Sequence, residues 1–263
     1  MVKLVCGTGT LLGLLSAAKR LLAAECCIFL SPGVEQLEQW RPYHRWGKTL
    51  RPSDAIITFN YDRVVEIAAG DSVCPIRPLR QTREDEIEAY HTDRSSLWKL
   101  HGSVDWERKG DGEAIQQSDP EFAVTCDDDA IYIATPGPSK AEMTRTLAYY
   151  WRQALIHIEN ASAIVFIGYR FPPSDAQARE LLLAAIASNR TQHISVHIVL
   201  GDPGPSTQRL EALLRFVCAK GRHENEKPIF TNPPVRTYSL KVHPLFSQDF
   251  LSVFAREDLF PKG

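Results

Sequence analysis

Short apolar runs, separated by stretches with helical periodicity, are the feature that most constrains the fold of this chain. Four of these runs predict buried strands, at residues 4–6, 55–59, 163–167 and 194–200. The third reads Ala-Ile-Val-Phe-Ile, and such a continuous run is typical of a central parallel strand covered on both faces. Residues 97–100 are a fifth, weaker strand candidate.

Three stretches carry apolar residues at the spacing of one helix face. The first contains Leu147, Tyr150, Trp151, Leu155 and Ile158. The second contains Ala178, Leu181, Leu182, Ala185 and Ile186, and the third contains Leu210, Leu213, Leu214 and Val217. Strands that alternate with helices indicate βαβ units. The sequence therefore predicts an α/β fold with a Rossmann-like, doubly wound, mostly parallel sheet and helices on both faces.

The length of 263 residues suits one domain with a sizeable core, and we expect a single domain over residues 1–263. Two polar stretches, 105–138 and 221–234, are expected to be loop excursions. The first contains the consecutive Asp127, Asp128 and Asp129. Successive side chains on an extended chain point in alternate directions, so these three carboxylates do not converge on a metal by themselves.

The charge and the cysteines limit the classes of partner. A formal net charge of -2 gives no electrostatic case for nucleic acid or an anionic membrane. None of the six cysteines forms a Cys-x-x-Cys pair, so we expect no zinc ribbon and no other metal site. Scattered thiols of this kind suit a cytoplasmic protein.

The first 24 residues also fit a secretory signal peptide, which would compete with a cytoplasmic location. Gly7, Gly9 and Gly13 interrupt the apolar stretch, and Lys19 and Arg20 stand where a cleavage region is normally neutral. No run reaches the roughly 18 apolar residues that a membrane span needs. We therefore favour the cytoplasmic interpretation and expect no membrane partner.

Polar residues and glycines follow each predicted strand. In chain order they are Gly7-Thr8-Gly9, Asn60-Tyr61-Asp62, His101-Gly102-Ser103, Gly168-Tyr169-Arg170 and Gly201-Asp202. Each is an ordinary turn sequence by itself. Ligands of open α/β sheets bind at the carboxyl ends of the strands, so the recurrence predicts a binding crevice. The Gly-x-Gly loop before an apolar helix from Leu11 would suit a dinucleotide phosphate.

Three motifs resemble the sirtuin-like superfamily. They are Thr58-Phe59-Asn60-Tyr61-Asp62, Lys99-Leu100-His101-Gly102-Ser103 and Ile167-Gly168-Tyr169-Arg170-Phe171-Pro172-Pro173-Ser174-Asp175. The Thr-x-Asn-Tyr-Asp form is similar to a divergent bacterial branch found in antiphage defence systems. The resemblance extends over about residues 54–203, and it implies an NAD-binding fold with NAD as the substrate.

The resemblance also implies a role for each matched residue. Asn60 would hold the ribose and the attacking water, and His101 would act as general base. Asp62 would order the loop at the ribose end of the site. Further contacts with the dinucleotide would come from Gly7, Thr8, Gly9, Tyr61, Gly168, Tyr169, Arg170, Gly201 and Asp202.

Two positions depart from the family pattern. Gly7-Thr8-Gly9-Thr10-Leu11 keeps the two glycines of the first motif and loses its serine, and the interval from Gly9 to Asn60 is short. Arg170 stands where a serine is usual, and its guanidinium would reach a phosphate or pair with Asp175. The cysteine ribbon of protein-deacylating sirtuins is absent from the sequence.

The implied reaction is hydrolysis of NAD to nicotinamide and ADP-ribose. Nicotinamide leaves a pyridinium cation as a neutral molecule, so its departure needs no general acid, unlike that of an ordinary glycosidase leaving group. One base and one positioning amide then suffice. A nucleotide-binding regulatory subunit without turnover and an NAD-dependent protein deacylase remain as alternatives. We expect control through a homo-oligomer or a separate sensor subunit.

Overall fold

The structure, a computed structural model, describes residues 8–27, 33, 37–78, 93–108, 114–117, 122–127, 129–134, 138–201, 203–223 and 236–260. Its contacts group the chain into two compact units. The first unit comprises Met1–Trp40 and Leu50–Ala148, and the second comprises Arg41–Thr49 and Tyr149–Gly263. The described strands form three three-stranded sheets, of which two lie in the first unit.

One sheet of the first unit is parallel and carries the motif residues. Its strand order is β1 (Ala55–Thr58), β3 (Ser95–Lys99) and β2 (Val73–Ile76). All residues of the central strand β3 are buried. Helix α3 (Val64–Ala69) and the 3-10 turn η4 (Gly70–Ser72) connect β1 to β2. Two of the predicted strands are thus confirmed within a residue or two, whereas β2 was not predicted.

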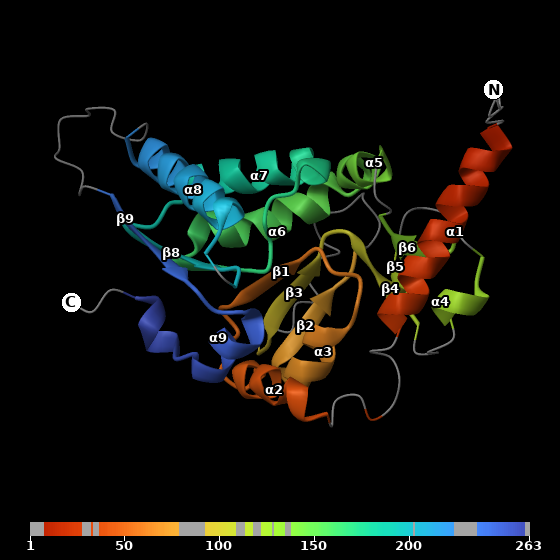
Figure 1. Cartoon of the computed structure of the whole chain (residues 1–263), viewed down its shortest axis with the longest axis horizontal. Helices are drawn as coiled ribbons and strands as arrows, with labels where there is room; N and C mark the ends of the chain where they lie inside the picture. Colours follow the sequence, from red (N-terminus) through yellow and green to blue (C-terminus); the bar gives the residue numbers. More distant parts are fainter. Residues whose placement is uncertain are drawn as a thin grey trace. The chain divides into compact units, whose positions relative to one another are not determined.

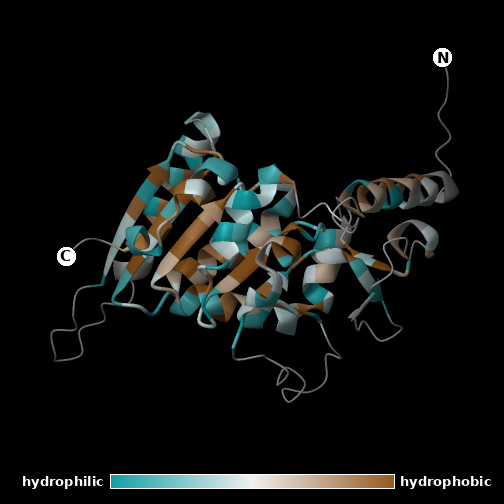
Figure 2. Ribbon diagram, turned by 90° about the horizontal axis from the view of Figure 1, so that it is seen from below, coloured by the Kyte–Doolittle hydropathy of each residue, from teal (hydrophilic) through white to brown (hydrophobic). Residues whose placement is uncertain are grey.

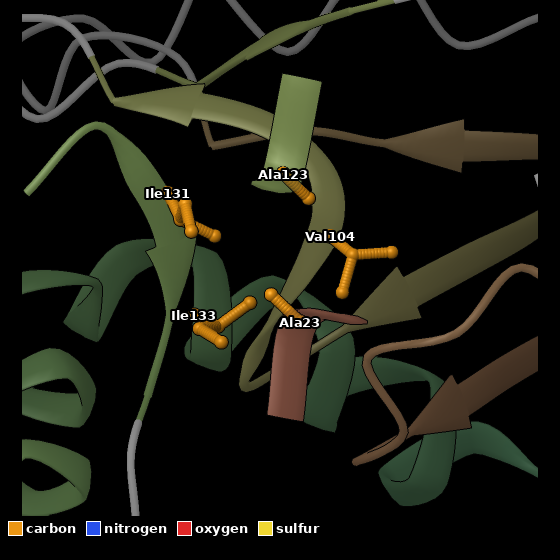
Figure 3. Close-up of a cluster of buried hydrophobic side chains, with 5 residues drawn as sticks. All are labelled: Ala23, Val104, Ala123, Ile131 and Ile133. Carbon is orange, nitrogen blue, oxygen red and sulfur yellow. The ribbon is translucent and has the colours of Figure 1, made fainter. Parts of the chain in front are cut away.

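The other sheet of the first unit is antiparallel. Its order is β5 (Ala114–Gln116), β4 (Gly102–Arg108) and β6 (Ile131–Ile133). Helices α1 (Thr8–Cys26) and α4 (Phe122–Thr125) pack with it, and α5 (Pro138–Thr146) follows β6. Figure 3 shows the five buried side chains of this core pointing toward one another: Ala23, Val104, Ala123, Ile131 and Ile133.

The described part of residues 105–138 is therefore not the expected loop excursion. It contains most of β4 together with β5, α4 and β6. The acidic residues that dominate its composition, such as Asp127 and Asp129, are exposed. The apolar residues between them, including Trp106 and Tyr132, are buried. Short strands embedded in polar sequence were masked by the average composition of the stretch.

The second unit is built on one parallel sheet. Its order is β7 (Ala163–Ile167), β8 (His193–Val199) and β9 (Thr237–His243). Its helices are α2 (Arg41–Gly47), α6 (Ala148–Asn160), α7 (Ala176–Ala187), α8 (Pro205–His223) and α9 (Ser247–Val253). Helices α7 and α8 cover one face of the sheet, and α2 and α9 cover the other (Figure 1). The described 3-10 turns include η6 (Pro173–Asp175) and η7 (Arg256–Leu259) in this unit, and η3 (Glu38–Trp40) in the first unit.

The three predicted helical stripes are confirmed. They lie on α6, α7 and α8, and most of their residues are buried, among them Trp151, Leu182 and Leu214. Several strands are brown, and so hydrophobic, along much of their length in Figure 2, whereas the helices mix brown with hydrophilic teal. The fold is thus a mixed α/β fold with mostly parallel sheets, as predicted. Residues 221–223 end α8, and the rest of the predicted loop 221–234 lies outside the described residues.

A polar hydrogen-bonded ladder joins β8 to β9 in the second unit. His197 Nδ1 lies 2.9 Å from His243 Nε2, and the two rings are stacked. His197 Nε2 lies 3.0 Å from Ser195 Oγ and 3.1 Å from the carbonyl of Leu259. Burial is the main cause that lowers the pKa of His197. Burial, followed by the neighbouring His197 and Lys241, lowers the pKa of His243 to about 4, although Asp258 opposes the shift.

Because these imidazoles are neutral in the folded protein, the second unit is expected to lose stability in acid. An unfolded histidine has a pKa near 6.5, so the unfolded chain binds protons first as the pH falls from about 6.5 toward about 4. The free energy of unfolding should therefore decrease over that window. We expect His243 to account for about 1 kcal/mol at pH 5 after solvent screening, which is a Tm change of about 2–4 °C.

Thermal denaturation at pH 7.5 and pH 5.0 measures this effect. Burial also lowers the pKa of His157, so the wild-type slope alone does not isolate the ladder. His243→Gln keeps an amide that donates to His197 Nδ1 and cannot be protonated in this range. A shallower pH dependence in His243→Gln is the expected result, and an unchanged slope would contradict it.

Candidate functional site

The ends of β1 and β3 place Asn60 and His101 side by side. Thr58 pairs with Lys99 in the parallel register, and the N–H of Leu100 donates to the carbonyl of Thr58 at 3.0 Å. Asn60 and His101 each lie two residues beyond this pair. Adjacent strands are about 4.8 Å apart, so both residues leave the sheet at neighbouring positions.

Aromatic contacts hold the segment around Asn60 against His101. The ring centroid of Phe59 is 4.8 Å from that of His101, and that of Tyr61 is 6.5 Å away. Phe59 and Tyr61 flank Asn60 in the sequence, so the segment that carries Asn60 lies against His101. Asn60 is exposed, whereas only 2% of His101 is accessible. An exposed amide thus stands on a segment that packs against an imidazole shielded from bulk water.

The loop that carries Asn60 is fastened by Tyr61 and Asp62. The Tyr61 hydroxyl donates to the carbonyl of Ala134. The carbonyl of Tyr61 accepts the N–H of Val104 at 3.1 Å. Asp62 Oδ1 accepts the N–H of Val64, the first residue of α3, at 3.0 Å. Asp62 therefore orders the loop between β1 and α3.

One buried and one partly buried ion pair lie at the same loop, and neither was predicted from the sequence. Lys99 Nζ is 2.9 Å from Glu66 Oε1, and both side chains are buried. Arg63 Nε is 3.3 Å from Oδ2 of the buried Asp105. The only signal was a lysine beside an apolar strand segment, and nothing in the sequence pairs it with Glu66.

The motif glycines of the second unit stand at the carboxyl ends of β7 and β8. Gly168 has φ 72° and donates its N–H to the carbonyl of Val199 at 2.9 Å. Gly201 has φ 81° and donates its N–H to the carbonyl of Leu245 at 2.9 Å. Both are in the left-handed region that favours glycine. Asp202 lies outside the described residues.

Tyr169 and Arg170 form the turn after β7, in which Arg170 is exposed and Tyr169 is half-buried. The guanidinium of Arg170 donates to the carbonyl of Leu200 at 3.1 Å, and the side chain is exposed. Burial is the main cause that raises the pKa of the Tyr169 hydroxyl, and Asp175 adds to the shift. Tyr169 is therefore a neutral hydroxyl over the physiological range.

Phe171 is a further residue of this turn that the sequence did not mark. It has φ 52°, and no other described residue except glycine has a positive φ. Its buried ring lies 4.8 Å from the ring of Tyr169 and 5.5 Å from that of Phe166. A left-handed conformation costs a bulky residue about 1–2 kcal/mol, so these ring contacts stabilise a strained turn.

A family model described as a SIR2-like domain matches residues 54–218, which is more than half of the chain. The chain belongs to the SIR2-like family. None of the curated proteins compared matches it. The matched region contains both strand ends with Asn60 and His101 and the turns at Gly168 and Gly201. Membership is consistent with an NAD-utilising enzyme.

The predicted phosphate loop lies outside the matched SIR2-like region. The strand at 4–6 and Gly7 are outside the described residues, and α1 begins at Thr8, three residues before the expected start at Leu11. Near its Cys26 end, α1 packs against the same buried cluster as Tyr61. The assignment of Gly7, Thr8 and Gly9 to the phosphate therefore stays a prediction.

The described part of the SIR2-like chain has neither a cluster of metal ligands nor a membrane-spanning helix. No group of three or more His, Cys, Asp or Glu side chains there is arranged to hold a metal ion. No helix within those residues is long and apolar enough to cross a membrane.

Proposed function

We propose that this SIR2-like chain hydrolyses NAD to nicotinamide and ADP-ribose. The observation that carries the proposal is the placement of Asn60 and His101 at the ends of two paired parallel strands. The carboxyl ends of such strands are where open α/β sheets bind ligands. The family supports a sirtuin-like use of NAD, and hydrolysis is our more specific inference.

The chemistry fits these two side chains. The water oxygen forms a bond to the ribose C1′ while the bond from C1′ to the pyridinium nitrogen breaks. The electron pair of that bond stays with nicotinamide, which leaves neutral, and the water proton passes to His101. An imidazole has an ordinary pKa near 6.5, in the range where a general base is effective. The amide of Asn60 both donates and accepts, so it can hold the water and a ribose hydroxyl.

By the resemblance, residues after β7 and β8 make further contacts with the dinucleotide: Gly168, Tyr169, Arg170 and Gly201. Gly168 has open space where a Cβ would stand, whereas the missing Cβ of Gly201 makes room for the ring of Phe246. Arg170 supplies an exposed cation. Contacts from Gly7, Thr8, Gly9 and Asp202 rest on the resemblance alone. A single NAD-binding domain over 1–263, without a metal, is part of the same proposal.

We further infer a biological role from the Thr-x-Asn-Tyr-Asp motif. Its resemblance supports a cytoplasmic effector of a bacterial antiphage defence system. An enzyme that depletes NAD must be inactive until it is triggered. Control by self-assembly or by a separate sensor subunit is therefore part of the proposal.

The deciding experiment incubates the purified full chain with NAD and identifies the products by liquid chromatography and mass spectrometry. Equal amounts of nicotinamide and ADP-ribose are expected, alone or after addition of proteins encoded beside it. Release that requires an acyl-lysine peptide would instead support a deacylase. Binding of NAD by calorimetry without release under either condition would support a regulatory subunit.

A further inference from the structure

The ammonium of Lys99 is enclosed beneath the loop that carries Asn60. Its side chain has 0% exposure, and Nζ lies 2.9 Å from Glu66 Oε1. Nζ also donates to the carbonyl of Asp62, and it lies 3.4 Å from the carbonyl of Tyr61. An ammonium has three donors, so these three acceptors suit its full donor capacity.

A buried ion pair of this kind contributes little net free energy to folding stability. Removing a carboxylate and an ammonium from water is costly, and well-packed apolar residues of similar volume are often as stable or more stable. Loss of only one partner is strongly destabilising, because the other charge is left buried. The observation that needs explanation is therefore why two of the three acceptors of Lys99 belong to the backbone of one loop.

The position of the two carbonyls gives the explanation. Tyr61 and Asp62 directly follow Asn60, and Lys99 precedes His101 by two residues. The Lys99 ammonium thus connects two segments. One is the end of β3, just before His101, and the other is the loop that follows Asn60. Glu66 on α3 supplies the counter-charge from the far end of the same loop.

We propose that Lys99 is a positioning residue that holds the backbone of the loop after Asn60 in the conformation in which Asn60 binds its ligand. The inference rests on the proposed function for its effect on NAD turnover, but not for its effect on the loop. Lys99 lies under the loop and does not enter the reaction itself. A displacement of about 1 Å of a positioned group can cost about 100-fold in rate, so loss of the carbonyl bonds is expected to lower kcat.

The test uses the full chain with Lys99→Met and Glu66→Met combined, which removes both charges and all three donors. The Tm is expected to stay within about 5 °C of the wild type, since no unpaired charge remains. The kcat for NAD is expected to fall at least tenfold (order of magnitude) with little change in KM. Hydrogen–deuterium exchange of the peptide spanning Asn60 to Val64 is expected to become faster, while β3 stays protected.

Glu66→Gln is the matched control. Its amide oxygen still accepts from Lys99, but the buried ammonium loses its counter-charge, so the fraction of folded protein is measured beside the rate. In the folded fraction both carbonyl bonds and the wild-type kcat should persist. If the double methionine variant does not fold, Lys99→Gln combined with Glu66→Gln replaces it with the same expectations. Glutamine is one bond shorter than lysine, so its amide falls short of both carbonyls.

The outcomes separate this inference from the proposed function. A folded double variant with unchanged exchange overturns the inference, whatever its kcat. Faster exchange with wild-type kcat also overturns it, because the loop would then have no bearing on turnover. A wild-type protein that releases no nicotinamide contradicts the proposed function, and the exchange experiment alone then decides whether Lys99 fixes the loop.

Discussion

Asn60→Ala is expected to abolish most NAD turnover without destabilising the protein. The side chain is exposed, so its truncation should change the free energy of unfolding by no more than about 0.5 kcal/mol. Its loss removes the amide that holds the water and the ribose, and the rate should fall by well over an order of magnitude (~10²). Nicotinamide release at saturating NAD measures the effect.

His101→Ala is expected to lower turnover at least tenfold (order of magnitude), because positioned general-base catalysis typically contributes about 10²–10⁴-fold. The imidazole is buried against Phe59, so this variant also loses packing, and its fraction folded must be measured beside its rate. Ser53→Ala is a suitable control for both variants, since Ser53 is exposed and precedes β1. Wild-type rates of NAD loss in both Asn60→Ala and His101→Ala would contradict the catalytic assignment.

Much of the parallel framework was predictable from hydrophobic pattern. The run at 163–167 forms the parallel strand β7 with the predicted limits, but it stands at one end of the described strand order and only its Phe166 is buried, so the prediction of a central, fully covered strand is wrong. The neighbourhood of Asn60 and His101 was also predictable. Both follow strands of one parallel sheet, and parallel strands end at the same edge.

The parts that could not be predicted depend on contacts between distant residues. Glu66 and Lys99 are 33 positions apart, and only the folded register of α3 against β3 makes them partners. Strand β9 carries half-buried and exposed residues with an alternating polar ladder, so its apolar signal is weak. The antiparallel sheet was concealed for another reason, since its short strands are separated by acidic residues.

Gly102→Ala is expected to cause the largest loss of stability of any single methyl addition at the site. Gly102 has φ 86°, and an added Cβ would lie 1.8 Å from the carbonyl oxygen of Tyr132 and 3.0 Å from Cα of Ile133. Both obstacles are backbone atoms next to or in β6, which pairs with β4 at Gly102 and Ile133. Relief therefore requires the strands to separate. The left-handed strain and the overlap together should cost about 3–5 kcal/mol.

Gly70→Ala provides the matched control in the same unit. Gly70 also has a positive φ, of 52°, but a Cβ there would meet nothing within 4 Å. Urea denaturation should show a loss of about 1 kcal/mol for Gly70→Ala, from backbone strain alone. Equal decreases in the free energy of unfolding of the two variants would mean that the backbone of β6 shifts at little cost to accommodate the added Cβ. A large difference would show that the turn after His101 tolerates only glycine, so the imidazole is held in place by the pairing of β4 with β6.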